Sequence, residues 1–342
     1  MSSMSKLLLV LEGAAQKVPP IWMMRQAGRY LPEYRKLRAE AGSFWAMALN
    51  PKYAAEVTLQ PIRRFGFDAA ILFSDILTVP EALGQKVTFT QGEGPSLEPV
   101  TSAEGFVEDR ERWASYFEPV YEALRLTRAG LPPGTALLGF AGAPWTLATY
   151  LAAGAGGDEQ KAAKLWAYRD PDGFGYLLDI LADCVAFHLI RQLDAGADAV
   201  QIFDSWASGL PAQLYERVVI APTKKVVAMV RAAKPNAKII GFPRASTQSG
   251  YLNYAQAIGV DALSLDTAMP MRWAAENLTC ALQGNLDPIA LIAGGAALDR
   301  AVDDILQSVG GKPHIFNLGH GILPETPIAH VEQLLKRVRN RS

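Results

Sequence analysis

The sequence predicts an α/β protein, a single (β/α)8 barrel of the TIM type with a β-hairpin inserted after the second strand. Two observations point to this fold. Eight short apolar runs recur along the 342 residues, and each run is bounded by turn or polar residues. The segments between them are long enough for crossover helices and carry apolar residues at helical spacing. An open, doubly wound sheet is the second possibility.

The eight apolar runs are the expected strands of a parallel sheet, because strands buried on both faces are apolar throughout. In chain order they are 20–24 (PIWMM), 69–73 (AAILF), 137–142 (LLGFAG), 199–203 (AVQIF), 238–242 (KIIGF), 262–265 (ALSL), 281–284 (ALQG) and 314–318 (HIFNL). The clearest crossover helices are expected at 54–66 and 215–234.

Two segments interrupt this alternation. Residues 85–100 (QKVTFTQGEGPSLEPV) are expected to form a β-hairpin around Gly92, Glu93 and Gly94. The glycine- and alanine-rich residues 151–160 are expected to form a mobile loop after the third strand. Neither a repeat of fixed period nor a linker is visible, so residues 1–342 are expected to form one domain.

Composition narrows the class of function. With 33 Lys and Arg against 34 Asp and Glu, the net charge of -1 gives no global field for nucleic acid or an anionic membrane. The apolar run from Leu7 to Leu11 is interrupted by Glu12 and is too short for a secretory signal or a membrane span. We therefore expect a cytoplasmic, soluble protein whose anion sites come from local arginines. Cys184 and Cys280 are expected to be small core residues, since two distant cysteines make no disulfide framework.

Polar residues follow almost every expected strand. In a parallel barrel the ligand binds at the C-terminal ends of the strands, where the βα loops converge. The residues at these ends are Arg25, Ser74, Asp75, Asp204, Ser205, Arg244, Asp266, Asn285, Asp287 and His320, with Tyr150 a little beyond the third strand.

Each of these residues also has a structural interpretation. Asp75, Asp204, Asp287 or Ser205 could cap a following helix, and for any one aspartate taken alone the cap is favoured. His320 lies between two glycines that mark a tight turn, so a structural role is as well supported as a functional one. The argument for function is the convergence of all these residues on one edge of the predicted fold.

The segment MMRQAGRY, residues 23–30, places Arg25 and Arg29 close together, with Arg38 nearby. Guanidinium groups bind carboxylate or phosphate through two parallel hydrogen bonds. Carboxylate is favoured, because the chain has no phosphate-binding loop of the GxxxxGK[ST] type. The alternative is a surface ion pair with Glu33, which would stabilise the fold by only ~0–1 kcal/mol.

Metal-ion and nucleophile chemistry find little support in the sequence. His188 lies four residues after Cys184 and His314 lies in an expected strand, but no nearby ligand completes a zinc set. The segment FDSWAS around Ser205 lacks the GxSxG pattern of a nucleophile elbow. We therefore expect no metal site.

The chain resembles the uroporphyrinogen decarboxylase family over nearly its whole length. The similarity lies in PPIWMMRQAGRYLPEYR, ILFSDILTVPEALG, GFAGAPWTLATY, QIFDSWAS, QGNLDP and NLGHGILPETP, which come in the family's order. The resemblance implies a (β/α)8 barrel, usually a homodimer, that acts in heme biosynthesis. It would remove the four acetate carboxyls of uroporphyrinogen III as CO2, giving coproporphyrinogen III, without cofactor or metal.

The resemblance also implies roles for individual residues. The substrate-binding loop would be Arg25, Gln26, Ala27, Gly28 and Arg29, and Asp75 would be the central carboxylate. Arg25, Arg29 and Asp75 are the residues implied in catalysis; Tyr150, Ser205 and His320 are further substrate contacts, and Arg38 belongs to the first block without an assigned role.

The sequence departs from the family in two loops. It has FPRASTQ, residues 242–248, where the family often has a glycine-rich turn, and Ser208 where glycine is common. These departures leave the role of Arg244 open.

The implied substrate explains why two arginines stand in MMRQAGRY. Uroporphyrinogen carries eight carboxylates, and Arg25 and Arg29 would supply positive charge locally in a nearly neutral protein.

A protonated pyrrole ring can accept the electrons left by CO2, so no cofactor is needed as electron sink. Asp75 would accept pyrrole N–H bonds and stabilise the positive ring. The proton donor stays open between an arginine, with a pKa of ~12 or above, His320, with an ordinary pKa of ~6.5, and a bound water.

Two other functions compete with decarboxylation. Corrinoid-dependent methyltransferases share the superfamily but need zinc, for which Cys184, Cys280, His188 and His314 form no recognisable set. A tetrapyrrole-binding protein without catalysis is the third possibility, because binding arginines alone do not establish turnover.

Overall fold

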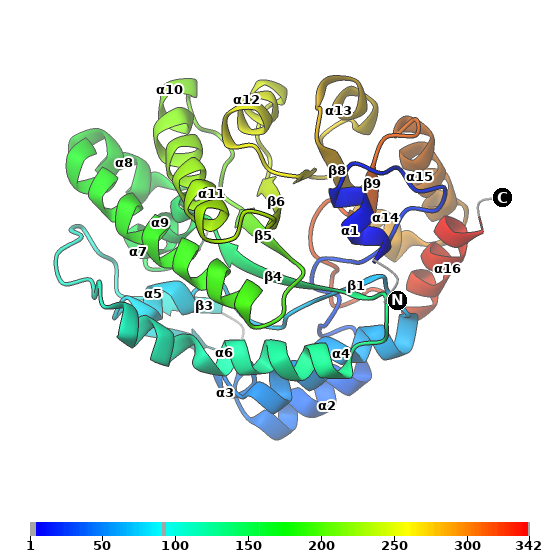
Figure 1. Ribbon diagram of the computed structural model, residues 1–342, viewed down its shortest axis with the longest axis horizontal. Coiled ribbons are helices and arrows are strands. Elements are labelled where there is room, and N and C mark those ends of the chain that lie inside the picture. Colours follow the sequence, from blue (N-terminus) through cyan, green and yellow to red (C-terminus); the bar gives the residue numbers. More distant parts are fainter. Residues whose placement is uncertain (1–4, 91–93, 157, 341–342) are drawn as a thin grey trace.

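In the computed structural model, which describes residues 5–90, 94–156 and 158–340, seven parallel strands form one curled sheet. Their spatial order, β1-β4-β5-β6-β7-β8-β9, follows the chain. The strands are β1 (Ala69–Ile71), β4 (Ala136–Gly142), β5 (Ala199–Asp204), β6 (Lys238–Pro243), β7 (Ala262–Ser264), β8 (Ala281–Leu286) and β9 (His314–Leu318). Helices surround this sheet, with α4 and α6 below it, α9 on its left and α15 and α16 on its right in Figure 1.

The first expected strand, 20–24, lies between the two edge strands of this sheet. Ile21 forms a parallel bridge with Phe316 of β9, and its carbonyl accepts a hydrogen bond from Asp68 N, 2.9 Å away, at the start of β1. The contact stays a single bridge for two reasons. Pro20 has no N–H to donate, and Met24 N donates to the Asn317 side chain, at 3.0 Å, instead of a backbone carbonyl. Seven expected strands are therefore confirmed as strands, and the first is present as a bridge.

The helices occupy the connections as the sequence predicts. They are α1 (Lys6–Leu11), α2 (Pro32–Ala41), α3 (Phe44–Ala48), α4 (Pro51–Phe65), α5 (Thr78–Ala82), α6 (Arg110–Gly130), α7 (Pro144–Ala153), α8 (Lys161–Arg169), α9 (Pro171–Asp194), α10 (Ala212–Tyr215), the π-helix η1 (Glu216–Ile220), α11 (Ala221–Ala233), α12 (Gln248–Ile258), α13 (Met271–Asn277), α14 (Pro288–Ala293), α15 (Gly295–Ser308) and α16 (Ile328–Arg339). The expected helix at 54–66 is α4, and the one at 215–234 is η1 with α11. Within the described residues, α9 alone is long and apolar enough to cross a membrane, and 61% of its apolar window is buried inside the protein.

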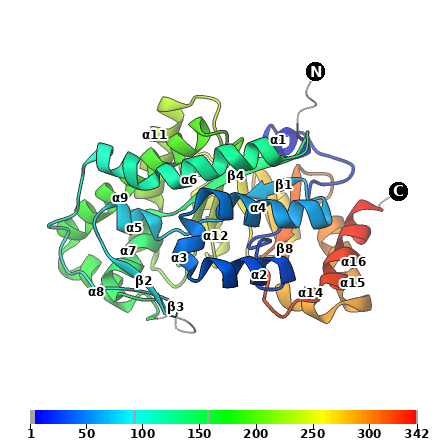
Figure 2. The ribbon, with the colours of Figure 1, turned by 90° about the horizontal axis from the view of Figure 1, so that it is seen from below.

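A two-stranded antiparallel sheet forms where the hairpin is expected. Strands β2 (Val87–Thr90) and β3 (Gly94–Leu97) pair from Val87 with Leu97 to Thr90 with Gly94. Residues 91–93 of the expected turn, with Gly92 and Glu93, lie outside the described residues. Figure 2 shows these strands at the end of the molecule that α7 and α8 occupy.

The segment 151–160 is only in part the loop that the sequence predicts. Residues 151–153 are the last turn of α7, and Gly154 ends this helix in the left-handed conformation. The helix continues because Leu151 and Ala152 are buried, which outweighs the loop character of the following glycines. Leu97 N donates to Gly154 O at 2.7 Å, which attaches β3 to this helix end. Residue 157 lies outside the described residues.

The N-terminal edge of the sheet is held by a motif that occurs three times, Gly-x-Asp-Ala at 66–69, 196–199 and 259–262. Each aspartate clamps one residue of the preceding strand by two hydrogen bonds, one to its Oδ2 and one from its own N–H. The clamped residues are Ile21 (N to Oδ2 2.9 Å) for Asp68, Leu137 (2.7 Å) for Asp198 and Ile239 (2.7 Å) for Asp261. The return bonds, from each aspartate N to the carbonyl of the same residue, measure 2.9, 2.8 and 2.9 Å. The glycine of each motif has positive φ and lets the chain turn from a helix into the next strand.

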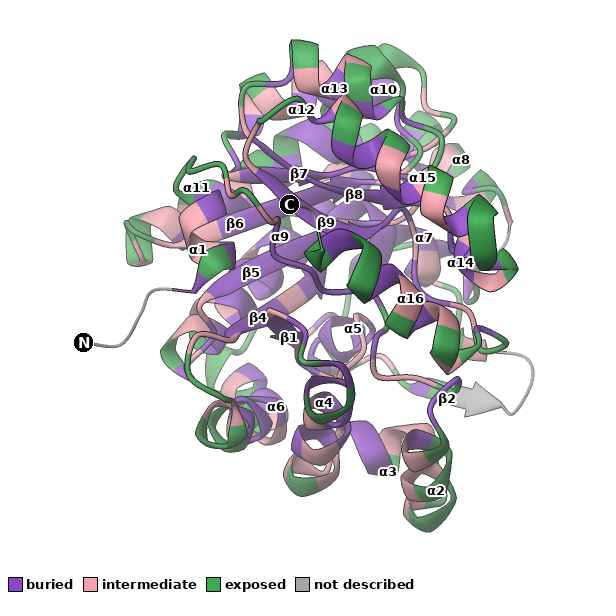
Figure 3. Ribbon diagram, turned by 90° about the vertical axis from the view of Figure 1, so that its right-hand side faces the viewer, coloured by how far each residue is buried: buried purple, intermediate pink, exposed green. Residues whose placement is uncertain are grey.

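The core has two layers. Inside the curl of the sheet lie Trp22, Leu138, Ile240 and Phe242, together with Leu7 of α1. The apolar run near the N-terminus is therefore a helix that packs into this inner core. The second layer lies between the sheet and the helices, which turn their exposed faces outward (Figure 3). Gln283 links polar groups of the inner core, since it accepts from Trp22 Nε1 at 3.0 Å and donates to Gln201 Oε1 at 3.0 Å.

The aspartate clamp yields a stability prediction. Asp68→Ala leaves the Ile21 N–H without its carboxylate acceptor, so the free energy of unfolding should fall by ~1–3 kcal/mol. Asp68→Asn keeps an acceptor oxygen and should lose less. Denaturant unfolding of the wild-type protein and the two variants measures these differences, and an Ala variant as stable as the wild type would show that the carboxylate contributes nothing.

Candidate active site

The segment MMRQAGRY is a loop that packs onto β1. It is not helical, because α2 begins only at Pro32. Gln26 is fully buried, and its side chain accepts from Met23 N at 3.1 Å and donates to Ala69 O at 3.0 Å. Tyr30 OH donates to the Gln26 carbonyl at 2.8 Å. The Gln26 side chain therefore positions the loop and does not face the solvent, and Ala27 packs against the main core.

Arg25 has an unusual backbone conformation for a residue with a side chain, with φ at 62°. Such strain persists where the surrounding structure imposes it, often at functional sites. The side chain runs against Gly321, where an added Cβ would lie 2.8 Å from Arg25 Cγ. A Cβ on Gly28 would lie 3.0 Å from Arg25 O. Both glycines therefore make room for Arg25.

The chain bends at Gly319 and His320, where the sequence suggested a tight turn. Neither Gly319 nor Gly321 has positive φ. They are needed for close approach, since an added Cβ on Gly319 would lie 2.7 Å from Thr267 Cα.

Four arginines near this loop carry charge without a counter-ion. Arg25, Arg29, Arg38 and Arg244 form no ion pair with any residue that the structure describes. The alternative partner, Glu33, is bound by Arg64 instead, through Nε at 2.7 Å and Nη2 at 2.9 Å. The guanidinium groups near the loop are thus available for an anionic ligand.

Asp75 lies just after β1 and is half-buried. Its Oδ1 accepts from Leu77 N at 2.8 Å, which forms a turn just before α5, but the N-cap residue of α5 is Leu77 and no side chain caps the helix. Its Oδ2 accepts no hydrogen bond from a described residue, which leaves one oxygen for a ligand. Burial raises the pKa of Asp75 to about 6, against the lowering effects of the Leu77 bond and of Arg25.

Tyr150 and His320 share the surroundings of Arg25 and Asp75. The positive charge of Arg25 lowers the pKa of Asp75, Tyr150 and His320, which come from β1, α7 and the end of β9. Burial outweighs this effect at Tyr150 and raises the pKa of its hydroxyl, so the group stays neutral. Its ring packs edge-on against Trp206, with 6.3 Å between the centroids.

His320 is a neutral imidazole at neutral pH. Burial, then Arg244 and Arg25, lower the pKa of His320 to about 4. Its Nδ1 accepts from Gly321 N at 2.7 Å, so the neutral ring carries its proton on Nε2.

Ser205 joins this group through its backbone, because its carbonyl accepts from Arg244 Nη1 at 3.3 Å. Its hydroxyl makes no hydrogen bond with a described residue. Arg29 and Arg38 lie elsewhere, on the side of α2, where both act on the pKa of Tyr34. The fold therefore brings Arg25, Asp75, Tyr150 and His320 together, with Ser205 beside Arg244.

Other polar residues at the strand ends have structural roles. Asp287 caps α14 by accepting from Ile289 N at 2.8 Å. Asp266 accepts from Ala245 N at 3.0 Å, and Asn285 donates to Asp266 O at 2.8 Å. These side chains hold the loops that carry the site.

The histidines and cysteines expected to lie outside any metal site are dispersed. His188 stacks on Phe117, with centroids 3.9 Å apart, and His314 bonds to Gly284 O at 2.7 Å. Both cysteines are free thiols. Over residues 5–90, 94–156 and 158–340, no group of three or more His, Cys, Asp or Glu side chains could hold a metal ion.

Asp204 is a feature that the sequence did not reveal. It was expected as a possible helix cap, but it is fully buried and accepts from Thr146 Oγ1 at 2.6 Å. Thr146 lies one turn before Tyr150 on α7 and also accepts from Trp206 N at 3.3 Å. Asp204 Oδ2 is buried and has no partner among the described residues, and burial raises its pKa to about 7. The only signal for this role in the sequence is the position of Thr146, the partner of Asp204, one helical turn before the expected site residue Tyr150.

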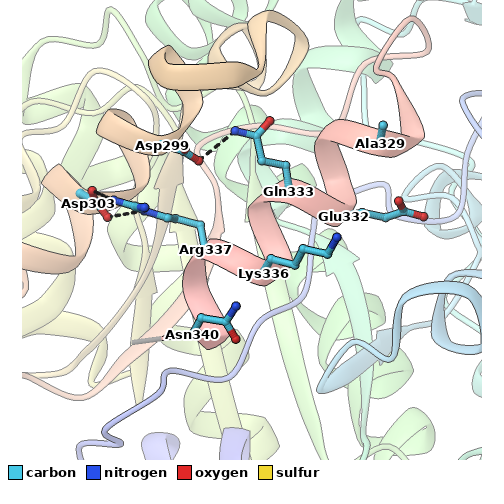
Figure 4. A pocket seen from close by; sticks show the side chains of 8 residues that line it. All are labelled: Asp299, Asp303, Ala329, Glu332, Gln333, Lys336, Arg337 and Asn340. Carbon is cyan, nitrogen blue, oxygen red and sulfur yellow. Dashed lines mark hydrogen bonds and ion pairs between the residues drawn. The ribbon is translucent and has the colours of Figure 1, made fainter. Parts of the chain in front are cut away.

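A surface pocket between α15 and α16 lies outside this group. Its walls include Asp299, Asp303, Gln333, Lys336 and Arg337. Arg337 pairs with Asp303 and Gln333 donates to Asp299, so these polar groups hold the two helices together (Figure 4). It contains none of the expected site residues.

Comparisons with known proteins agree on one family. The family model described as uroporphyrinogen decarboxylase (URO-D) matches residues 2–341. Uroporphyrinogen decarboxylases of Brucella anthropi and Brucella canis are each 54% identical over 335 residues, covering 98% of this chain and 98% of theirs.

Two solved structures share the fold at lower identity. A methyltransferase from Methanosarcina mazei has a TM-score of 0.81 at 22% identity and covers 97% of both chains. A B12-independent methionine synthase from Shewanella sp. W3-18-1 has a TM-score of 0.56 at 11% identity, over 95% of this chain and 94% of that one. At these identities the likeness concerns the fold alone.

The buried carboxyl of Asp204 predicts a pH-dependent stability. Its pKa is about 7 in the folded protein and ~3.9 in an unfolded chain, so between these values only the folded state keeps the proton. The wild-type protein should therefore lose stability relative to Asp204→Asn as the pH rises from ~4 to ~7. Denaturant unfolding across this window measures the difference, and a constant difference would contradict the assignment.

Proposed function

Because the chain belongs to the uroporphyrinogen decarboxylase family, we propose that Arg25, Arg29, Asp75, Tyr150, Ser205 and His320 bind uroporphyrinogen and remove its acetate carboxyls. The chain is a decarboxylase of heme biosynthesis, a carboxy-lyase, and the proposal concerns which residues act and how. The observation that carries it is Arg25, which has no counter-ion among the described residues, close to Asp75, whose Oδ2 accepts no hydrogen bond from a described residue. This arrangement suits a polyanion whose reacting ring becomes positive.

The proposal includes the architecture expected from the resemblance. Residues 20–24 take the place of the eighth strand of a (β/α)8 barrel, and the Ile21 bridge and the Asp68 hydrogen bond support this. Residues 1–342 form one domain with the β2–β3 pair as its inserted hairpin. The protein works in the cytoplasm as a homodimer, and the exposed Tyr168 and Tyr176, on the contacting helices α8 and α9, are apolar surface for a second copy.

Arg25 and Arg29 bind carboxylates of the substrate. Guanidinium groups without counter-ions favour carboxylates strongly, because charge-assisted bonds exceed neutral ones in strength. Gln26, Ala27 and Gly28 place the backbone of this loop against the substrate, with Gln26 fixing the loop on β1. The binding energy thus comes from local charge in a nearly neutral protein.

Asp75 stabilises the charged intermediate. Protonation of a pyrrole ring carbon makes the ring cationic, and the bond from the acetate methylene to its carboxylate then breaks, with the electron pair entering the ring. CO2 leaves an exocyclic methylene, a proton added to this carbon makes the methyl group, and the ring carbon loses its extra proton, so each acetate consumes one proton overall. Asp75 Oδ2 accepts the pyrrole N–H groups and balances the ring charge, an effect of preorganised electrostatics.

His320 acts as a hydrogen-bond donor and not as an imidazolium acid. With a pKa near 4, its ring is neutral at neutral pH and offers the Nε2–H to a substrate carboxylate. The proton that reaches the pyrrole then comes from the Arg25 guanidinium or from a water that it holds. Tyr150 and Ser205 contribute neutral hydroxyl groups around the substrate.

The two other functions are less well supported. A methyltransferase with a similar fold shares only 22% of its sequence with this chain, whereas relatives at 54% identity are named decarboxylases. A binding protein without turnover is tested directly. Anaerobic incubation with uroporphyrinogen, followed by chromatography of the oxidised products, should yield products that have lost four carboxyls.

Asp75→Asn is the sharpest test of mechanism. It keeps the size of the side chain but removes the negative charge, so turnover should fall by ~10²–10³ or more while the fold survives. The wild-type kcat/KM should fall as the pH drops below about 6, because Asp75 becomes protonated. A purely structural role predicts near-normal turnover for Asp75→Asn, since Asn can accept the Leu77 N–H bond as Asp does. Turnover within a few-fold of wild type in the Asn variant would leave Asp75 as a structural residue only.

Arg25→Ala and Arg29→Ala should each raise the KM for uroporphyrinogen about tenfold or more. The melting temperature should hardly change, because an exposed arginine without an ion pair stabilises the fold little. Arg300→Ala on α15 removes the same charge from an exposed outer helix and serves as control. Normal kinetics in both loop variants would refute the carboxylate-binding role.

A further inference from the structure

Arg244, directly after β6, is a charged side chain that the proposed function leaves without a task. It is half-buried, and Nη1 donates to Ser205 O at 3.3 Å. Its Nε and Nη2 donate to no acceptor among the described residues. A guanidinium in this state has lost part of its hydration and keeps most of its donors unused, so an acceptor from outside the chain would be favourable.

The backbone around Arg244 is rigidly held. Arg244 N donates to the Asp204 carbonyl at 3.0 Å, and Ala245 N donates to Asp266 Oδ2 at 3.0 Å. Ala245 has φ at 57°, a left-handed conformation that costs energy for a residue other than glycine. The loop that departs from the family pattern is therefore an ordered support for this arginine.

Arg244 and Arg25 approach the site from opposite sides. Along the ring of strands, β6 is the fourth strand from residues 20–24 in either direction, by way of β1, β4 and β5 or of β9, β8 and β7. His320 interacts with both arginines, since each lowers the pKa of its imidazole. Arg244 thus faces the same space as Arg25 from the far side.

We propose that Arg244 binds a substrate carboxylate on the side of the site opposite Arg25, a carboxylate other than the one that leaves in that turnover. This inference rests on the proposed function. Uroporphyrinogen carries carboxylates on all four rings, so a macrocycle centred over Asp75 presents anions in opposite directions. Arg25 and Arg29 belong to one loop and can bind carboxylates on only one side of the macrocycle. Arg244 can bind a carboxylate on the opposite side.

The test compares Arg244→Gln with the wild-type protein. A lost charge-assisted hydrogen bond should raise the KM for uroporphyrinogen about ten- to a hundredfold. The value of kcat should stay within a few-fold, because a remote carboxylate is bound equally in ground and transition states. Arg244→Lys keeps the charge and should recover part of the affinity. Arg300→Gln, the same change on the outer helix α15, should leave the KM unaltered.

A second measurement distinguishes a direct contact from a distorted loop. Removing the positive charge of Arg244 should raise the pKa of His320 above its value of about 4, which NMR titration of the imidazole reports without substrate. A KM equal to that of the Arg300→Gln control, or an unchanged His320 titration, would overturn the inference. Failure of the proposed function gives a different result, because the wild-type protein itself would then release no CO2 from uroporphyrinogen.

Discussion

The two-point hydrogen bond between an aspartate and the preceding strand is the constraint on which this structure depends. At Asp68 it joins residues 20–24 to β1, and Asp198 and Asp261 repeat it further along the sheet. A parallel sheet needs its strands in fixed register, because the loops that follow them must meet at one edge. Holding the N-terminal ends in this way places the loop of Arg25, the end of β1 and the loop after β6 around one space.

The N-terminal edge of the sheet serves stability, and the C-terminal edge carries the functional residues. At the N-terminal edge, charges are neutralised, as in the pairs of Arg128 with Asp198 and Arg231 with Asp261. At the C-terminal edge, Arg25 and Arg244 keep their charge without a counter-ion among the described residues. Unpaired charges of this kind contribute little to the stability of the fold, so we attribute their arrangement to ligand binding.

Two aspartates at this edge illustrate how burial decides the role of a side chain. Asp75 is half-buried, keeps Oδ2 free and lies under the influence of Arg25, so it remains a carboxylate for a ligand near neutral pH. Asp204 is fully buried beside Thr146 and holds its proton to higher pH. Asp75 can balance positive charge on a ligand, whereas Asp204 connects α7 to the loop after β5 through Thr146. Both follow an apolar strand, and nothing in their local sequence separates them.

The sequence by itself determined seven of the strands, the helices at 54–66 and 215–234 and the identity of Arg25 and Asp75 as candidates, because apolar periodicity and motif order are local properties of the chain. It did not show that Ile21 forms only a bridge, that the Gln26 side chain is turned into the core, or that Glu33 is taken by Arg64. Only the tertiary structure decided these points, together with the roles of Asp204 and Arg244. The hydrogen bonds of Asp204 and Arg244 depend on groups tens of residues away, Thr146 and Ser205, and distances between such groups are set only when the sheet closes.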